Sequence, residues 1–221
     1  MSIDDSTPEM GIDPLGLDVA EIKVQVGKYG SRANKGVKGP GKYYYEGKVV
    51  EDGLIRLGWA TNDASLDLGS DKEGFGYGDS QAGDKNGGFK RNCNKENGYG
   101  QPIKEGDLIG CFLDFDNGNI QWSKNGATFE PAFKIPDELK DEAFFPDGRV
   151  IFNFGDEPLS FLPKRDWLPV SQANENNVVP NKNIGWRMNP FDATTGTDVS
   201  GNGYTLQSKL NGEWNGCRAN K

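Results

Sequence analysis

Tight-turn residues divide the sequence into short apolar and aromatic runs, and this spacing constrains the fold more than any other feature. Asp52-Gly53 separates two such runs, and Asp116-Asn117-Gly118 separates two others. Turn residues of this kind between apolar runs are typical of β-hairpins. We therefore expect antiparallel strands joined by short turns, with a hairpin at each of these positions. The expected strands span residues 21–26, 42–50, 54–59, 74–78, 108–115, 119–123 and 150–154.

Helical periodicity is nearly absent, and only residues 135–140 favour a turn or two of helix. Aromatic residues make up 11% of the chain, whereas disordered polar chains carry few, so we expect a packed core. Trp59, Trp122 and Cys111 lie within apolar runs and are expected in that core. The pattern as a whole predicts an all-β fold, an antiparallel β-sandwich.

Two polar segments interrupt the expected strands. Residues 79–101 are rich in glycine, asparagine and lysine, and they are expected to form a long surface loop. Residues 171–183 are rich in asparagine, and we expect an extended, solvated linker there.

The composition excludes several classes of function. The chain has no histidine, which removes mechanisms built on an imidazole base and metal sites with histidine ligands. Its three cysteines form no Cys-x-x-Cys pair, a usage that favours a reducing compartment. The formal charge of −8 argues against a nucleic-acid-binding face. The sequence contains no signal-peptide pattern and no apolar run long enough to span a membrane, so we expect a cytoplasmic or nuclear protein without a cofactor.

A short repeat links the two ends of the chain. Residues 30–35 (GSRANK) recur as residues 216–221 (GCRANK), with five of the six positions identical. Self-similarity at a fixed offset indicates tandem units. The tail from Trp186 onward is therefore predicted to begin a second unit.

Several motifs occur in the order found in SPRY domains: GKYYYE (41–46), LGWAT (57–61), LDFDNG (113–118), SKNG (123–126) and FNFG (152–155). Two more, ASLDLG (64–69) and GFGYG (74–78), resemble the SPRY module inserted in one branch of the DEAD-box RNA helicases. The tail, with WRMNPFD (186–192) and EWNGCRA (213–219), resembles the opening of that module. The chain is therefore similar to the SPRY family over roughly residues 17–163, and again in the tail.

The resemblance implies a bent, concanavalin-like β-sandwich that has no catalytic residues and binds protein segments through loops at one rim. Family members continue after the Phe-Pro pair with a further strand, but here only three residues separate Pro146 from Val150. A core strand is therefore expected to be missing or shortened, and the tail is expected to supply strands to the same chain or to a second copy. The expected parts are a flexible N-terminus (1–16), the SPRY domain (17–170), an asparagine-rich linker (171–185) and a partial second opening segment or swapped strands (186–221).

Polar residues on the loops between strands are the candidates for partner binding, because a rigid scaffold that displays such loops suits recognition. Asp114 and Asp116 are interpreted as turn residues, since the spacing of a calcium loop is not met and no hydrolase is implied; no metal site is expected. The candidate partner-binding residues are Arg32, Asn34, Asn62, Asp63, Ser65 and Asp67.

The sequence thus predicts a non-enzymatic protein–protein interaction module or a structural subunit of a larger assembly. Self-association through residues 186–221 is a further expectation. Two alternatives stay open: an accessory SPRY module of an RNA helicase that contacts RNA or protein, and a lectin-like carbohydrate binder. Neither a Walker-type sequence nor an Asp-Glu-Ala-Asp box occurs, so this chain carries no helicase core.

Overall fold

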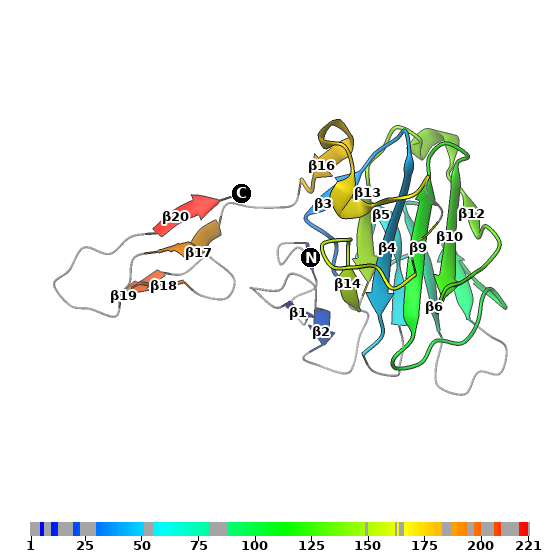
Figure 1. Cartoon of the computed structure of the whole chain (residues 1–221), viewed down its shortest axis with the longest axis horizontal. Helices are drawn as coiled ribbons and strands as arrows, with labels where there is room; N and C mark the ends of the chain where they lie inside the picture. The colour runs from blue at the N-terminus through cyan, green and yellow to red at the C-terminus, as the bar shows by residue number, and fades with distance from the viewer. Residues whose placement is uncertain are drawn as a thin grey trace. The chain divides into compact units, whose positions relative to one another are not determined.

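The computed structural model in Figure 1 divides the chain into two units, Met1–Lys182 and Asn183–Lys221, and each is described by itself. The structure describes residues 5–6, 10–12, 20–22, 30–50, 55–79, 88–148, 150–161, 163, 166–182, 187–193, 197–199, 206–208 and 217–220.

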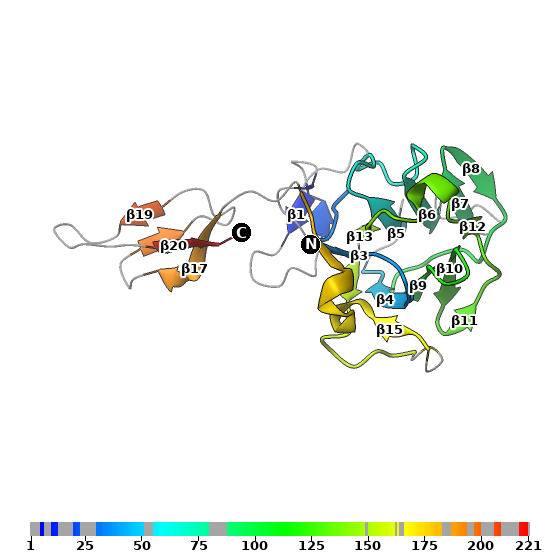
Figure 2. The same ribbon diagram turned by 90° about the horizontal axis from the view of Figure 1, so that it is seen from above.

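Two mainly antiparallel sheets form the sandwich of the first unit, and they stack face to face as the view from above shows (Figure 2). The first sheet has the order β11 (Ala127–Thr128), β10 (Asn119–Lys124), β9 (Leu108–Asp114), β4 (Lys42–Lys48) and β14 (Ile151–Asn153), with β12 (Phe133–Lys134) on β10 and β15 (Leu168–Pro169) on β4. The second sheet has the order β16 (Val178–Pro180), β3 (Lys35–Val37), β13 (Phe144–Gly148), β5 (Ile55–Thr61), β6 (Gly74–Asp79), β7 (Phe89–Asn92) and β8 (Asn94–Asn97). One pairing, β15 with β4, is parallel.

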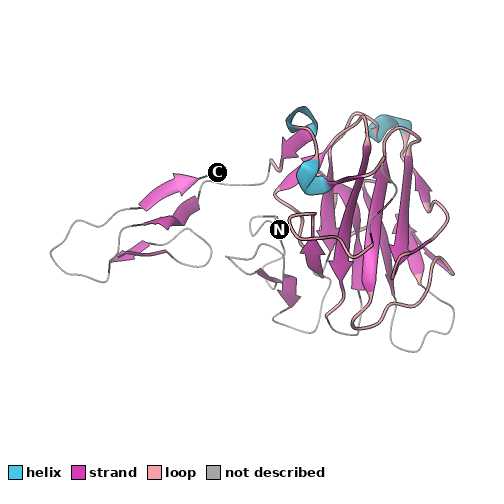
Figure 3. Ribbon diagram, viewed as in Figure 1, coloured by secondary structure: helices cyan, strands magenta, loops and turns pink. Residues whose placement is uncertain are grey.

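The core lies between the sheets and is mainly aromatic. Successive side chains of a strand point to opposite faces, so Tyr43 and Tyr45 of β4 both enter the core. The ring of Tyr45 meets that of Trp59 edge-on, with centroids 5.0 Å apart. Trp59 and Trp122 are fully buried, as is Cys111, which confirms the core expected for all three. Strands dominate in Figure 3, and the all-β sandwich predicted from the sequence is confirmed.

A local turn signal predicted one hairpin correctly, and a second, Asn-Gly turn follows it directly. β9 and β10 pair across residues 115–118, where Asn117 donates its backbone N–H to the Asp114 carboxylate at 2.9 Å. β10 turns directly into β11 through Asn125 and Gly126, whose φ angles of 49° and 83° suit an Asn-Gly turn. The short helical turn was also expected, and it is the 3-10 helix η1 (Asp137–Leu139).

The hairpin expected at Asp52-Gly53 is wrong. β4 pairs with β9, β14 and β15, whereas β5 pairs with β13 and β6 in the other sheet. The chain therefore crosses from one layer to the other between β4 and β5, because each strand buries its own core face against the opposite sheet.

The segment 79–101 is not one long loop. Phe89–Asn92 (β7) and Asn94–Asn97 (β8) form a hairpin that extends the second sheet, and Phe89 is buried. The turn is made at Cys93, whose φ of 57° lies in the left-handed region. This hairpin was missed because Phe89 is the one apolar side chain in its two strands, and the other residues of β7 and β8 are polar. Residues 80–87 of the expected loop lie outside the described residues.

The expected linker 171–185 also differs from the structure. It contains part of the 3-10 helix η2 (Val170–Gln172), then η3 (Glu175–Asn177) and β16, which pairs with β3 at the edge of the second sheet. Asparagine side chains take the place of apolar ones in holding this segment, so its composition resembles that of a solvated linker. Residues 183–185 lie outside the described residues.

The expected flexible N-terminus, 1–16, has ordered parts. Met10–Ile12 (β1) pairs with Ala20–Ile22 (β2), and Asp5 is buried at 6% exposure. β2 covers the first two residues of the strand expected over 21–26, and residues 23–26 lie outside the described residues. The remaining residues of 1–16 lie outside the described part.

The strand through Pro146 is present and pairs with β5 over five residues, from Phe144 to Gly148. β14 then begins at Ile151 in the other sheet. The departure from the family pattern is therefore a two-residue connection between these strands, and not the loss of the strand itself.

The described residues of the second unit form two strand pairs. β17 (Arg187–Ala193) pairs with β20 (Cys217–Asn220), and β18 (Thr197–Val199) pairs with β19 (Leu206–Ser208). Whether these strands open a second SPRY unit or exchange with a copy stays a prediction, as does the repeat.

Candidate functional site

The connection between β5 and β6, residues 62–73, is the loop that held most of the candidate residues; we call it the rim loop. Its two ends are tied by the backbone N–H of Thr61, which donates to the Glu73 carbonyl at 3.0 Å. The Asp71 carboxylate accepts the backbone N–H of Ser65 at 2.5 Å and that of Gly74 at 3.0 Å. Backbone groups fixed in this way hold the loop in one shape.

The middle of the rim loop is fixed from below by arginines. Arg56 of β5 donates to the carboxylate of Asp67 and to the carbonyl of Leu68. Arg91 of β7 reaches the same carboxylate at 3.4 Å. Leu68 is buried and packs with Ala60 and Ala64 in a small apolar cluster under the loop. The loop is thus anchored on one sheet face by both polar and apolar contacts.

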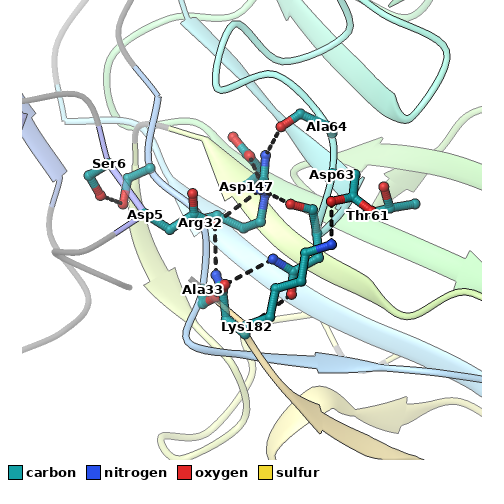
Figure 4. Close-up of polar contacts among 12 residues, drawn as sticks. Asp5, Ser6, Arg32, Ala33, Thr61, Asp63, Ala64, Asp147 and Lys182 are labelled. Carbon is teal, nitrogen blue, oxygen red and sulfur yellow. Dashed lines mark hydrogen bonds and ion pairs between the residues drawn. The ribbon is translucent and has the colours of Figure 1, made fainter. Parts of the chain in front are cut away.

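Arg32 lies beneath the start of the rim loop with only 1% of its surface exposed (Figure 4). Its guanidinium donates to the carbonyls of Asn62 at 3.0 Å and Ala64 at 2.6 Å. The same group pairs with the carboxylates of Asp5 at 3.0 Å and Asp147 at 3.4 Å. These contacts bring together four segments that are far apart in the sequence, and we call them the Arg32 cluster.

Asp147 is the member of the Arg32 cluster whose burial costs the most free energy when it is ionised, because it is completely buried. Burial raises its pKa to about 7, and the positive charge of Arg32 opposes that rise. The alternation of β13 explains this position: Phe144 enters the core, so Asp147 points to the opposite face, under the rim loop. Because this buried carboxylate forms its ion pair with Arg32, the cluster is sensitive to the loss of Arg32.

The C-terminal part of the first unit also reaches the rim loop. Asn181 is 2% exposed, and its side chain donates to the Asp5 carboxylate at 2.8 Å and to the Ala33 carbonyl at 3.0 Å. It also accepts from the Asn62 side-chain amide at 3.0 Å. The ammonium of Lys182 pairs with the Asp63 carboxylate (Figure 4).

The structure separates the six candidate residues into three groups. Arg32 is buried and positions the rim loop, and a role for it in partner binding stays a prediction. Asn62 and Asp63 contact the chain's own Asn181 and Lys182, and Asn34 accepts the backbone N–H of Asn181 at 2.9 Å.

Ser65 and Asp67 form the outer part of the rim loop. Ser65 is exposed, while Asp67 is half-buried between two arginines. The exposed residues of the rim loop are therefore Asp63, Ser65 and Lys72.

Three important residues were missed from the sequence: Asp5, Asp147 and Asn181. Asp5 and Asn181 lie in segments whose composition suggested flexibility, and Asp147 lies in a segment where no strand was expected. A single local signal was available for Asp147, namely that it stands in a Phe-Phe-Pro-Asp-Gly run with apolar neighbours.

A separate groove of about 560 Å³ lies on the outer face of the first sheet. Trp167 stands edge-on to Phe112 there, with ring centroids 5.0 Å apart. Aromatic and neutral polar side chains line it: Phe112, Gln121, Ser123, Thr128, Phe161 and Trp167, together with Gly126 and Pro163. The lining mixes flat rings with hydrogen-bonding groups and carries no charge.

Within the described residues, no group of three or more Cys, Asp or Glu side chains is arranged to hold a metal ion. Asp114 and Asp116 serve the turn after β9: Asp114 accepts from Asn117, and Asp116 accepts the Gly41 backbone N–H at 2.9 Å. In the same part of the chain, none of the helices has the length and apolar content needed to cross a membrane.

Comparison with known proteins places this sandwich in a family. A SPRY domain model matches residues 42–154, from β4 to just beyond β14. The chain is 41% identical over 182 residues to ATP-dependent RNA helicase DDX1 of Xenopus laevis, covering 80% of this chain and 23% of that protein.

Two further relatives extend the comparison. The chain is 34% identical over 190 residues to ATP-dependent RNA helicase Ddx1 of Drosophila melanogaster, covering 84% of this chain and 25% of that protein. It is 31% identical over 152 residues to heterogeneous nuclear ribonucleoprotein U-like protein 2 of Mus musculus, covering 61% and 19%. The chain thus spans about a quarter or less of the length of these relatives. The match of the SPRY model to half of the sequence, together with the two-sheet sandwich, shows that the chain belongs to the SPRY domain family.

Proposed function

We propose that this chain is a non-enzymatic protein-interaction module whose partner segment docks on the rim loop. SPRY domains are commonly protein-interaction modules, and this chain has no helicase core. The observation that carries the proposal is the contrast within the rim loop: its backbone is fixed by Arg32 and Asp71, while Asp63 and Ser65 are exposed. A pre-shaped loop loses little entropy when a partner binds, which favours affinity.

The proposed contact residues are Asn34, Asn62, Asp63, Ser65 and Asp67, with Arg32 acting as the residue that positions them. The two acidic side chains in this group, Asp63 and Asp67, are already paired with basic side chains of the same chain. The net charge of −8 for the whole chain favours a partner segment that carries basic residues, since complementary charge directs association.

Ser65→Arg tests the proposal because Ser65 is exposed and its change leaves the Arg32 cluster intact. Affinity purification with quantitative mass spectrometry should recover a partner on the wild-type chain and at least tenfold less of it on the variant. Asp141→Arg, at an exposed position after η1, is the matched control and should recover the partner in full. Equal recovery by all three proteins would show that the rim loop does not contact the partner.

The relatives' names favour a more specific version, in which this module belongs to an RNA-helicase system of the nucleus or cytoplasm. We infer that it contributes a protein contact there and not an RNA contact, since the −8 charge offers no phosphate-neutralising surface. Titration of labelled single-stranded RNA at low salt should show no binding. Binding that weakens steeply with added salt would favour the RNA alternative.

The groove on the outer face of the first sheet is the observation that favours the lectin-like alternative. Trp167 and Phe112 could face a sugar ring, while Gln121 and Thr128 could bond its hydroxyls. We rank carbohydrate binding second to protein binding. Among the interactions described, the residues of this groove make no contact with the rim loop, which carries the proposed protein site. A glycan array without hits would remove it.

Self-association through residues 186–221 is also part of the proposal. Deletion of these residues should lower the number of copies per particle, measured as the light-scattering mass divided by the chain mass, if the tail joins copies. An unchanged number of copies would remove the tail from any assembly interface.

A further inference from the structure

The segment Asn177–Lys182, which we call the arm, lies along the sandwich in the way that a bound peptide would. Its central residues form β16, which adds to the edge of β3 with Val178 opposite Val37 and Pro180 opposite Lys35 (Figures 1 and 2). Addition of a strand to an exposed sheet edge is a common mode of peptide recognition. Here the chain supplies that strand to itself.

Two carboxamide side chains anchor the arm, one on each side of β16. Asn177 donates to the Tyr43 hydroxyl at 2.8 Å and to the Pro40 carbonyl at 2.9 Å. Asn181 inserts into a polar notch made by the Asp5 carboxylate, the Ala33 carbonyl and the Asn62 side chain. Main-chain pairing combined with two side-chain anchors is the arrangement expected for a specific ligand.

The arm is attached by few apolar contacts. Of residues 171–182 only Asn181 is buried; Val178 and Val179 are half-buried and Pro180 is exposed. A groove of about 650 Å³ is lined by Val37, Pro146 and Phe154 of the sandwich and by Val170, Ala173 and Val178 of the C-terminal segment. Val170 and Ala173 pack against the core, so the chain before the arm is held by apolar contacts, whereas the arm is held mainly by strand pairing and by its asparagine side chains.

The site under the arm is held by contacts that do not depend on the arm. Arg32 fixes Asp5 and the carbonyl of Asn62, and the neighbouring β3 backbone pairs with β13. Release of the arm would expose a ready sheet edge and a preformed notch. Such edges bind other strands readily.

We infer that the arm is an intrachain ligand on a peptide-docking site, and that an extended partner segment with the same chemistry competes for it. The partner would pair with β3 and place carboxamide side chains in the positions of Asn177 and Asn181. The inference rests on the proposed function, because this notch adjoins the rim loop through Asn62 and Asp63.

A labelled peptide with the sequence of residues 175–184 is the probe, and fluorescence anisotropy is the readout. The wild-type full chain should bind it weakly, since the tethered arm competes at a high effective concentration. Asn181→Ala removes three hydrogen bonds from the arm but leaves the notch intact, so the variant should bind the peptide at least tenfold more tightly. Asn176→Ala, at an exposed arm-side position without side-chain anchors, is the matched control and should bind like the wild type.

Equal binding of the peptide by all three proteins, or none by any, would overturn the inference. So would dimerisation of the Asn181→Ala variant without the peptide, because the occupant would then be a second copy. A peptide with alanine at the position of Asn181 should lose at least tenfold in affinity for the variant.

Hydrogen exchange of the wild-type chain tests the same inference without any substitution. Arm amides should exchange at least 100-fold faster than those of β9, because local opening needs less free energy than global unfolding. Exchange as slow as that of β9 would show that the arm opens only on global unfolding, and the inference would fail. The rim-loop proposal would be unaffected, since it is decided by the Ser65→Arg comparison.

Discussion

Substitution of Arg32 by methionine should destabilise the sandwich strongly, and more at high pH than at low pH. The change removes the donor to the carbonyls of Asn62 and Ala64 and leaves the carboxylates of Asp5 and Asp147 without the guanidinium. Methionine keeps much of the side-chain length, so the effect reports lost polar contacts more than a cavity.

The magnitude follows from the buried groups. Two carbonyls that lose their donors cost about 1 kcal/mol each, which gives about 2 kcal/mol at pH 6. The pKa of Asp147 is about 7 with Arg32 present, and loss of the positive charge raises it further. Above pH 7 the wild-type Asp147 is ionised while the variant's retains its proton, so the difference grows by up to about 1.4 kcal/mol per pH unit. The total should reach about 4 kcal/mol by pH 9, within the range for a broken buried ion pair.

The direction in which pH changes the stability of the wild-type chain also follows from the pKa of Asp147. Asp147 has a folded-state pKa above its ordinary value, so the folded state binds its proton more tightly than the unfolded state does. The contribution of this group to stability is fully present below about pH 4 and is lost as the pH rises to about 7. In the wild type, therefore, ionised Asp147 is a cost that Arg32 reduces.

Urea unfolding followed by tryptophan fluorescence measures the free energy of unfolding at pH 6 and at pH 9. The pH 6 value reports the lost hydrogen bonds, and the increase at pH 9 reports the added cost of Asp147. Arg91→Met is the matched control, because Arg91 makes a 3.4 Å contact with Asp67 from a side chain that is 21% exposed. It should cost less than about 1 kcal/mol with no pH trend. A loss of about 1 kcal/mol or less for Arg32→Met, equal at both pH values, would refute the reasoning about the Arg32 cluster.

Two further predictions concern the sheets. Gly58→Ala should lower the free energy of unfolding in urea by more than about 2 kcal/mol, because a Cβ there would lie 2.1 Å from the Phe75 carbonyl oxygen. Gly118→Ala is the comparison and should cost about 1 kcal/mol, because only the φ of +65° is unfavourable there. Glu46→Gln should cost about 2 kcal/mol, because this buried carboxylate accepts the backbone N–H groups of residues 160 and 161, and a carboxamide can accept fewer bonds. Limited proteolysis should then cut residues 158–163 sooner than in the wild type, whereas cleavage at an unchanged rate would contradict this role of Glu46.

The parts of the fold predicted correctly are those that short-range chemistry determines. The turn after β9 needs only Asp114 and Asn117, which are three residues apart. Trp59, Trp122 and Cys111 lie within apolar runs, and all three are buried as expected. The Asp52-Gly53 signal failed because a turn dipeptide describes the local chain direction, while the layer that each strand joins depends on which apolar faces meet.

The parts of the site that were missed depend on partners far away in the sequence. Arg32 resembles any polar loop residue, because its two carboxylates are 27 and 115 residues distant along the chain. Asn181 lies 176 residues from Asp5, and an asparagine-rich segment gives no local sign that one amide is buried. Burial of these residues depends on contacts in the folded chain, so no short stretch of the sequence indicates that they are buried.

The Arg32 cluster also limits what could replace the arm. The same oxygen of Asp5, Oδ2, accepts from both Arg32 and the side-chain amide of Asn181. A carboxylate at the position of Asn181 would therefore face Asp5 and would have no proton to donate, even though its shape is nearly that of a carboxamide. The probe peptide with aspartate at this position should bind the Asn181→Ala chain at least tenfold less tightly than the asparagine peptide at pH 8. Equal affinity of the two peptides would mean that neither one enters the notch beside Asp5, wherever else on the sandwich they bind.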